Sequence, residues 1–125
     1  STMEAEIIAL GSCCRELLPI IALFDEIGIA IGIKKSDDKD SDSSIMHVTI
    51  HEDNSGALIL ATTPPPQFTP RSKHYAIKTI WFREQIIEKK IKVIPIETRL
   101  QLGDIFTKMP PQVTFEFLRN LLQGW

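Results

Sequence analysis

Three carboxylates, Glu6, Asp53 and Asp104, lie in segments from which they could jointly hold a metal ion. They are spread over about a hundred residues, so only the fold could bring them together. Each also has a simpler explanation. Glu6 would stabilise the positive end of a helix, and Asp53 with Asn54 could cap the next helix. Asp104 could be an ordinary surface charge. A shared metal site is therefore one hypothesis beside these.

Glu6 falls in the first turn of a helix that the sequence predicts from its first residues to about Ile27. An N-cap, early acidic residues and an apolar series at helical spacing all indicate this helix. Gly11 and Pro19 interrupt the series, which predicts a kink or two shorter helices. Gly28 is expected to end the helix.

Asp53 follows a segment, 45–50, that alternates and is rich in β-forming residues, and it would therefore end a strand. Sheets of α/β proteins commonly carry their sites at this end. The order of helices and strands predicts an α/β fold with two parallel strands, a right-handed connection and packed helices. The other expected elements are a short helix at 57–61, a long helix at 73–90, a strand at 91–96, a short helix with Asp104 at 100–107 and an amphipathic helix at 113–122.

Length and composition fit one domain spanning residues 1–125, and they exclude wholesale disorder and a fibrous repeat. Residues 34–44 contain no apolar side chain and predict a flexible acidic loop. No run of about 18 apolar residues occurs, so we expect no membrane insertion. The adjacent Cys13 and Cys14 indicate neither a disulfide framework nor a zinc knuckle. We therefore expect an intracellular location, in the cytoplasm or nucleus.

Charge divides the chain into two unlike halves. Residues 1–62 hold 4 Lys and Arg against 11 Asp and Glu, a net charge of −7, and residues 63–125 hold 10 against 5, a net of +5. The halves could simply attract each other, or an acidic metal site could lie beside a basic surface that meets phosphate. The basic residues gather with Tyr75 and Trp81 on the long helix, which suits either nucleic-acid phosphates or a solvated helix with a buried Trp81.

Several motifs resemble the ribonuclease H domain of copia-type LTR retrotransposon polyproteins, in order and over nearly the whole chain. The first ten residues, STMEAEIIAL, resemble that family's STMEAEYIAL, and Leu102–Lys108, LGDIFTK, resembles its LADIFTK. Between them lie DNSGA at 53–57, RSKHYAI at 71–77 and FREQ at 82–85, the last two resembling the family's RTKHIDIRYHFIREQ.

The resemblance implies a ribonuclease H-like fold and Mg²⁺-dependent cleavage of RNA in RNA–DNA hybrids. Glu6, Asp53 and Asp104 match acids that hold two Mg²⁺ ions in the family, so the resemblance makes them both metal ligands and catalytic residues. Arg71, Lys73, His74 and Lys78 would belong to the surface that binds the hybrid.

The family pattern also contains a first catalytic aspartate and three strands that precede the STMEAE segment, and the 125 residues contain neither. We therefore expect a partial ribonuclease H-like domain, one bound Mg²⁺ ion or none, and little activity by the chain alone. An alternative is a co-opted or truncated interaction subunit that docks on a larger assembly. In both cases the strand at 45–50 would keep an open edge for a protein partner or a second copy.

Overall fold

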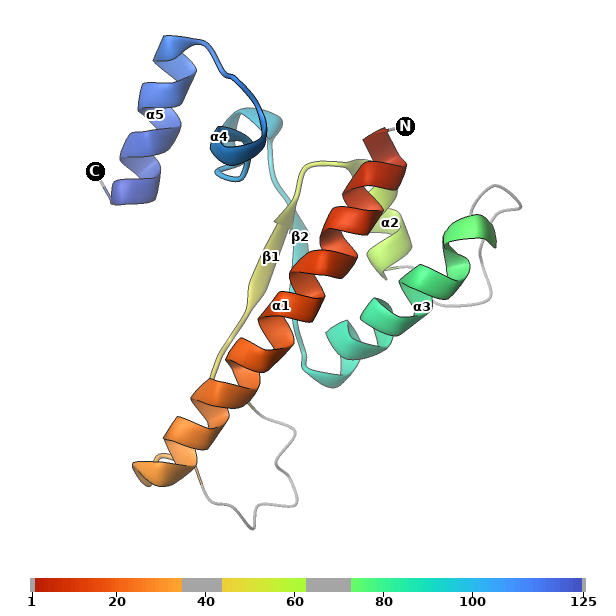
Figure 1. Ribbon diagram of the computed structural model, residues 1–125, viewed down its shortest axis with the longest axis vertical. Helices are drawn as coiled ribbons and strands as arrows, with labels where there is room; N and C mark the ends of the chain where they lie inside the picture. Colours follow the sequence, from red (N-terminus) through yellow and green to blue (C-terminus); the bar gives the residue numbers. More distant parts are fainter. Residues whose placement is uncertain (1, 35–43, 63–72, 125) are drawn as a thin grey trace.

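The computed structural model describes residues 2–34, 44–62 and 73–124, the side chains of residue 2 and of residues 73–80 excepted. It mixes helix and strand around one small parallel sheet (Figure 1). The elements are α1 (Thr2–Ala30), β1 (Thr49–Glu52), α2 (Ser55–Thr62), α3 (Lys73–Glu88), β2 (Lys92–Pro95), a 3₁₀ turn at Thr98–Leu100, α4 (Asp104–Thr107) and α5 (Gln112–Gln123).

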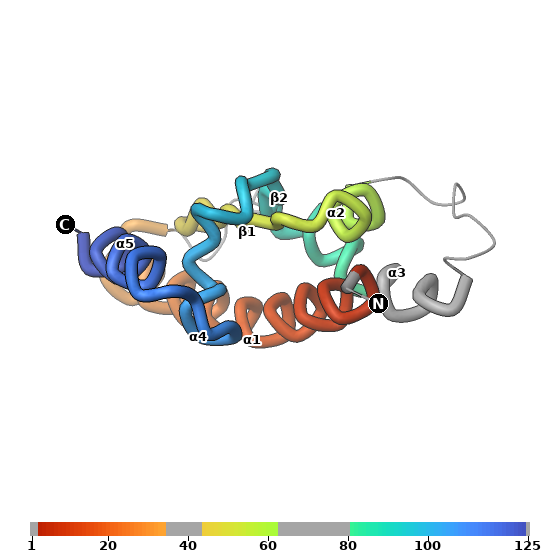
Figure 2. Tube along the Cα trace, turned by 90° about the horizontal axis from the view of Figure 1, so that it is seen from above, coloured from red at the N-terminus to blue at the C-terminus, as the bar shows by residue number. Residues whose placement is uncertain are grey.

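The sheet pairs β1 with β2 in parallel, as the order of elements predicted. Its register sets Ile50 opposite Val93 and Glu52 opposite Pro95. Pro95 lies at the last pairing position, where its missing N–H costs the ladder least. Helix α1 crosses one face of the sheet in Figure 1 and lies below the sheet in Figure 2.

The core forms where α1, α2 and α3 meet this face. A stripe at helical spacing along α1, formed by Ile7, Leu10, Cys14 and Ile21, is buried. It joins Ala57, Leu60 and Ala61 of α2, Phe82 and Ile86 of α3, and Ile91, with Ile50 and Val93 of the sheet packed against them. Gly11 lies where α3 comes near, because a Cβ there would be 3.7 Å from the Phe82 ring.

One of the two expectations for α1, its division into two shorter helices, was wrong, because one helix runs through Pro19. Proline inside a helix removes one backbone hydrogen bond and costs about 3 kcal/mol. Here the ring is exposed, and the buried stripe continues in register from Cys14 before it to Ile21 after it. Packing on both sides of Pro19 therefore offsets the lost bond.

The predicted end of α1 at Gly28 was also wrong. A Cβ on Gly28 would lie 2.8 Å from Cδ1 of Ile45, so this glycine permits a close packing contact within the helix. The helix ends at Ala30, and the chain then turns at Gly32, whose φ of 81° suits a residue without a side chain.

The first strand was predicted too early, since β1 runs from Thr49 to Glu52 and not from residue 45 to 50. Asp25 on α1 explains the shift. Its carboxylate accepts hydrogen bonds from the Ile45 N–H at 2.9 Å and the Ser44 hydroxyl at 3.0 Å, and the Ser44 oxygen accepts the Met46 N–H at 3.1 Å. These backbone groups therefore bond to side chains and not to a neighbouring strand.

Lys34 and Ser44, the two ends of the predicted acidic loop, both contact Asp25. The Lys34 ammonium lies 3.6 Å from the Asp25 carboxylate, and its side chain is only 13% exposed. The two ends of the segment are therefore anchored to α1. Residues 35–43, the rest of that predicted loop, lie outside the described residues.

The helix predicted at 100–107 is divided. A 3₁₀ turn ends at Leu100 and α4 begins at Asp104, with a turn between them. The Gln101 side chain bonds out of this turn to the His51 carbonyl at 3.0 Å, and this bond attaches the segment to β1. The other predicted elements were confirmed within two residues at each end.

By length and composition alone, α1 qualifies as a candidate membrane-crossing helix, contrary to the expectation from the sequence. Its best window has a mean hydropathy of 1.9 and is 22% buried. The core helix of a water-exposed domain can pass the same test, and the buried stripe of α1 packs on α2 and α3 as such a helix does. Many of its other apolar side chains, among them Ile20, Leu23, Phe24 and Ile27, are exposed.

Candidate metal centre

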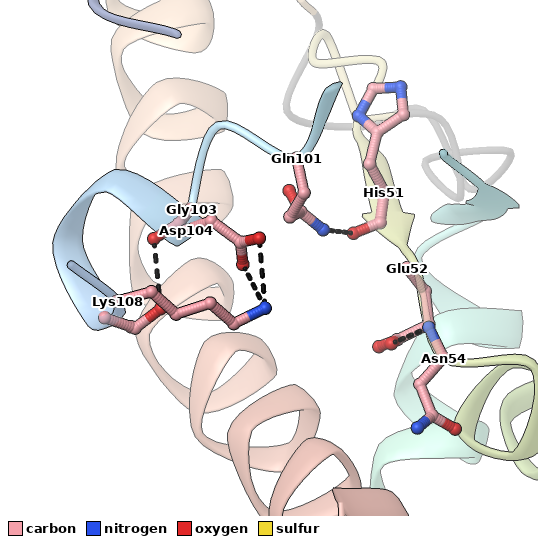
Figure 3. A network of polar contacts seen from close by, with 8 residues as sticks. His51, Glu52, Asn54, Gln101, Gly103, Asp104 and Lys108 are labelled. Atoms are coloured by element: carbon pink, nitrogen blue, oxygen red, sulfur yellow. Dashed lines mark hydrogen bonds and ion pairs between the residues drawn. The ribbon is translucent and has the colours of Figure 1, made fainter. Parts of the chain in front are cut away.

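An open pocket lies at the carboxyl end of β1, where three segments meet. The first turns of α1 contribute Glu6, the end of β1 contributes Glu52 and Asp53, and the α4 segment contributes Asp104 and Lys108. The fold therefore brings all three acids singled out in the sequence to one pocket. Figure 3 shows Asp104 and Lys108 on one side of the site and Glu52 on the other.

Glu6, Glu52 and Asp53 form a close triplet. One carboxylate oxygen from each of these residues lies within 4.8 Å of the others. Glu6 and Asp53 are half-buried, and Glu52 is buried with 6% of its surface exposed. Asp104 lines the same pocket but is not a member of this close triplet.

Asn54 holds the turn that follows β1. Its N–H donates to Oε1 of Glu52 at 2.9 Å, and its own Oδ1 accepts the Ala57 N–H at 3.0 Å. The second bond is a helix N-cap for α2. Because Asn54 performs the capping, Asp53 is left to face the pocket.

Burial raises the pKa of the Glu52 carboxyl above its ordinary value. The Asn54 N–H opposes this effect, while repulsion from Glu6 and Asp53 adds to it. A buried carboxylate next to two others is destabilised by its own charge. A cation placed among the three would remove that repulsion.

Asp104 is paired with Lys108, the residue that follows α4. The Lys108 ammonium lies 3.0 Å from both Asp104 carboxylate oxygens. The hydrogen bond from this ammonium to Asp104 is the largest cause that raises the pKa of Lys108, and attraction to the charges of Asp104, Asp53 and Glu6 adds to the increase. The ammonium therefore lies in the field of all three sequence-predicted acids.

The donor set fits a hard divalent cation. Mg²⁺ binds oxygen at about 2.1 Å, so two ligands on opposite sides of the ion are about 4.2 Å apart. The oxygens of Glu6, Glu52 and Asp53, within 4.8 Å of one another, need only small side-chain adjustments to reach that spacing. Soft metals are poorly served, because the pocket lining offers one thiol against four carboxylates, and such metals prefer sulfur ligands. Burial, followed by the charge of Glu16, raises the pKa of this thiol, Cys13.

Glu52 was missed by the reasoning from sequence, although a signal for it exists. Side chains two apart in a strand share a face, so the alternation that placed Ile50 inward also places Glu52 inward. Because the strand was predicted to end at residue 50, Glu52 fell outside it and was not predicted as a site residue.

The predicted nucleic-acid residues are only partly visible. Arg71 lies outside the described residues, and so do the side chains of Lys73, His74 and Lys78, whose backbone belongs to α3. The expectation of a buried Trp81 was wrong, since this residue is 37% exposed and its ring centroid lies 5.6 Å from Cζ of the Arg15 guanidinium. Phe82 occupies the core position on α3.

The chain is similar over nearly its whole length to retrovirus-related Pol polyproteins of transposons. It is 25% identical over 122 residues to the Pol polyprotein from transposon TNT 1-94 of Nicotiana tabacum, which covers 98% of the chain and 8% of the relative. It is 29% and 28% identical over 116 residues to those from transposons RE2 and RE1 of Arabidopsis thaliana, which cover 93% of the chain and 7% of each relative.

These similarities support an origin in a retrotransposon polyprotein. The chain spans 7–8% of the length of these curated relatives. No protein-family model matches it, and no solved structure matches it.

Proposed function

We propose that this chain is a ribonuclease H-like domain derived from a retrotransposon polyprotein, with Glu6, Asp53 and Asp104 as ligands for Mg²⁺. The convergence of these three acids on one pocket is the observation that supports this most, because they come from three separate motifs. Glu52 is the fourth carboxylate of the site. The substrate class is RNA paired with DNA.

Each charged residue of the site would have a role that its position determines. Glu6 and Asp53 lie near enough to share one ion, and Asp104 would bind it from the opposite side of the pocket. Glu52 strengthens the negative field from its buried position and is fixed by the Asn54 N–H. A bound Mg²⁺ would supply charge stabilisation for displacement at a phosphate. The basic residues Arg71, Lys73, His74 and Lys78 would hold the phosphates of the hybrid.

Metal binding is tested by calorimetric titration of Mg²⁺ and Mn²⁺ into the 125-residue chain. We expect one ion to bind, and we expect Asp53→Asn and Glu6→Gln each to weaken it by about tenfold or more, because each removes a charged ligand. Glu84→Gln is the matched control, since Glu84 is exposed on α3 away from the pocket. Equal affinities for all four proteins would refute the site.

Little or no cleavage of an RNA–DNA hybrid is expected from this chain alone in Mg²⁺. The first aspartate of the family pattern has no match in these 125 residues, and loss of a metal ligand costs several kcal/mol of charge stabilisation. Robust cleavage that Asp53→Asn abolishes would contradict this expectation and show a complete active site.

A second candidate function is docking on another protein. Among the described residues, β1 pairs with β2 alone, and apolar side chains of α1 are exposed in its second half. Unpaired strand edges and contiguous apolar surface favour association with a partner or a second copy. Light scattering at micromolar concentration tests this, and a stable monomer that binds metal would leave only the first candidate.

A further inference from the structure

Lys108 occupies an unusual position for a surface lysine. It follows α4, its backbone N–H donates to the Asp104 carbonyl at 2.9 Å, and its ammonium returns to the carboxylate of the same residue. The ammonium is equidistant from both oxygens, at 3.0 Å. Asp104 is only 17% exposed at its side chain, whereas Lys108 is 55% exposed. The acid is thus held in the wall of the pocket and the lysine covers it from the solvent side.

The α4 segment is fixed against the acidic triplet. Gln101 ties the turn before α4 to the His51 carbonyl on β1, next to Glu52 (Figure 3). Lys108 lines the same pocket as Glu6, Glu52 and Asp53. A single positive charge is therefore built into a pocket that has four carboxylates.

On the basis of the proposed function, we propose that Lys108 is an internal counter-ion of this site. Lys108 holds Asp104 in place when no metal is bound, and it must leave Asp104 when a divalent cation binds. An ion that uses Asp104 needs one of the two oxygens that the ammonium now covers. The exposed lysine side chain is long and can swing into solvent. Lys108 would thereby lower the affinity of the pocket for metal.

Charge repulsion gives the upper limit of this effect, because an ammonium that moves into solvent escapes most of it. If the ammonium stayed in place, a divalent ion on Asp104 would lie about 5 Å from it, and the repulsion in a water-like dielectric is equivalent to roughly 3- to 20-fold in affinity. Lys108→Gln keeps most of the side-chain length and removes the charge. We therefore expect Lys108→Gln to bind Mg²⁺ and Mn²⁺ more tightly than the unaltered chain, by at most the roughly 3- to 20-fold that this repulsion allows.

The test compares metal titrations of five whole chains by calorimetry: unaltered, Lys108→Gln, Asp104→Asn, the double variant with both changes, and Lys89→Gln. Lys89→Gln removes the same charge from the end of α3, outside the pocket, and should change affinity less than twofold. The gain from Lys108→Gln should vanish with Asp104→Asn, because the counter-ion then has no carboxylate to cover.

A second measurement follows Lys108 directly. The NMR signal of its side-chain Cε and Hε groups should shift as Mg²⁺ is added, and saturate with the ion. If metal binds but the metal affinity of Lys108→Gln equals that of Lys89→Gln, or is weaker than that of the unaltered chain, the counter-ion role of Lys108 is wrong and the proposed metal site stands. Failure of every variant to bind either ion would overturn both.

Discussion

Glu52 gives the sharpest test of the electrostatics of the pocket, through Glu52→Gln in the absence of metal. The substitution removes one of three carboxylates whose oxygens approach within 4.8 Å. Glutamine keeps an oxygen that can still accept the Asn54 N–H, so the turn after β1 is preserved. The expected result is a more stable protein at neutral pH.

The distances give the magnitude. Two unit charges 4.8 Å apart repel by about 0.9 kcal/mol in a water-like dielectric, and Glu52 has two such neighbours, Glu6 and Asp53. Glutamine should therefore raise the free energy of unfolding by roughly 1–2 kcal/mol at pH 7 and low salt, and by less at 1 M salt.

The pH dependence follows from the raised pKa of Glu52. A carboxyl whose pKa is higher in the folded state binds protons more readily there, so stability falls as pH rises through that folded pKa. The advantage of Glu52→Gln should be absent below about pH 4, where the unfolded carboxyl is also protonated, and should grow as pH rises through the folded pKa.

Urea denaturation followed by circular dichroism at pH 3.5 and pH 7 measures both effects. Glu84→Gln serves as the control, and it should change stability by less than about 0.5 kcal/mol. Saturating Mg²⁺ should reverse the order, because the unaltered chain then gains more from the ion. Destabilisation by Glu52→Gln at pH 7 without metal, or an equal gain at both pH values, would refute the reasoning.

Two further predictions concern the frame that holds the pocket. Burial works to raise the pKa of Asp25, but the hydrogen bonds from the Ile45 N–H and the Ser44 hydroxyl and the nearby Lys34 ammonium together lower it. The contribution of Asp25 to stability is therefore present above about pH 4, and it is lost as pH falls through the lower folded pKa. Asp25→Ala should cost about 2 kcal/mol at pH 7 and far less at pH 2, as measured by urea denaturation, and an equal loss at both would contradict this assignment. Phe82→Ala should cost about 3–5 kcal/mol by the same measurement, because Phe82 is 1% exposed. Phe106→Ala is the control and should cost under about 0.5 kcal/mol, because Phe106 is 75% exposed. Similar losses for the two variants would show that Phe82 is not a core residue.

Much of the fold could be predicted from local pattern. The strand at 91–96 and the final helix needed only alternation and helical spacing, and both were found within two residues. The continuation of α1 through Pro19 could not be predicted in this way, because it depends on packing against α2 and α3. The late start of β1 likewise depends on Asp25, which is 20 residues from Ile45 in sequence.

The residues of the candidate site also differ in how far local sequence pattern predicts them. Glu6, Asp53 and Asp104 were singled out by their places in the expected elements and by the resemblance of their segments to the retrotransposon motifs, and the fold brings them to one pocket. Glu52 required the correct strand boundary, and Lys108 required the side-chain conformation in α4. Neither follows from the composition of its own segment.

The parallel pairing of β1 with β2 has a consequence for the order of folding. Thr49 and Lys92, paired in the sheet, are 43 positions apart, and α2 and α3 lie between them in the chain. Closing so long a loop is entropically costly, so the sheet should form after the helices have packed. Glu52 belongs to the paired strand, and Asp53 follows it directly. The acidic pocket should therefore be assembled in the last step of folding, after the apolar contacts that compensate for its repulsion have formed.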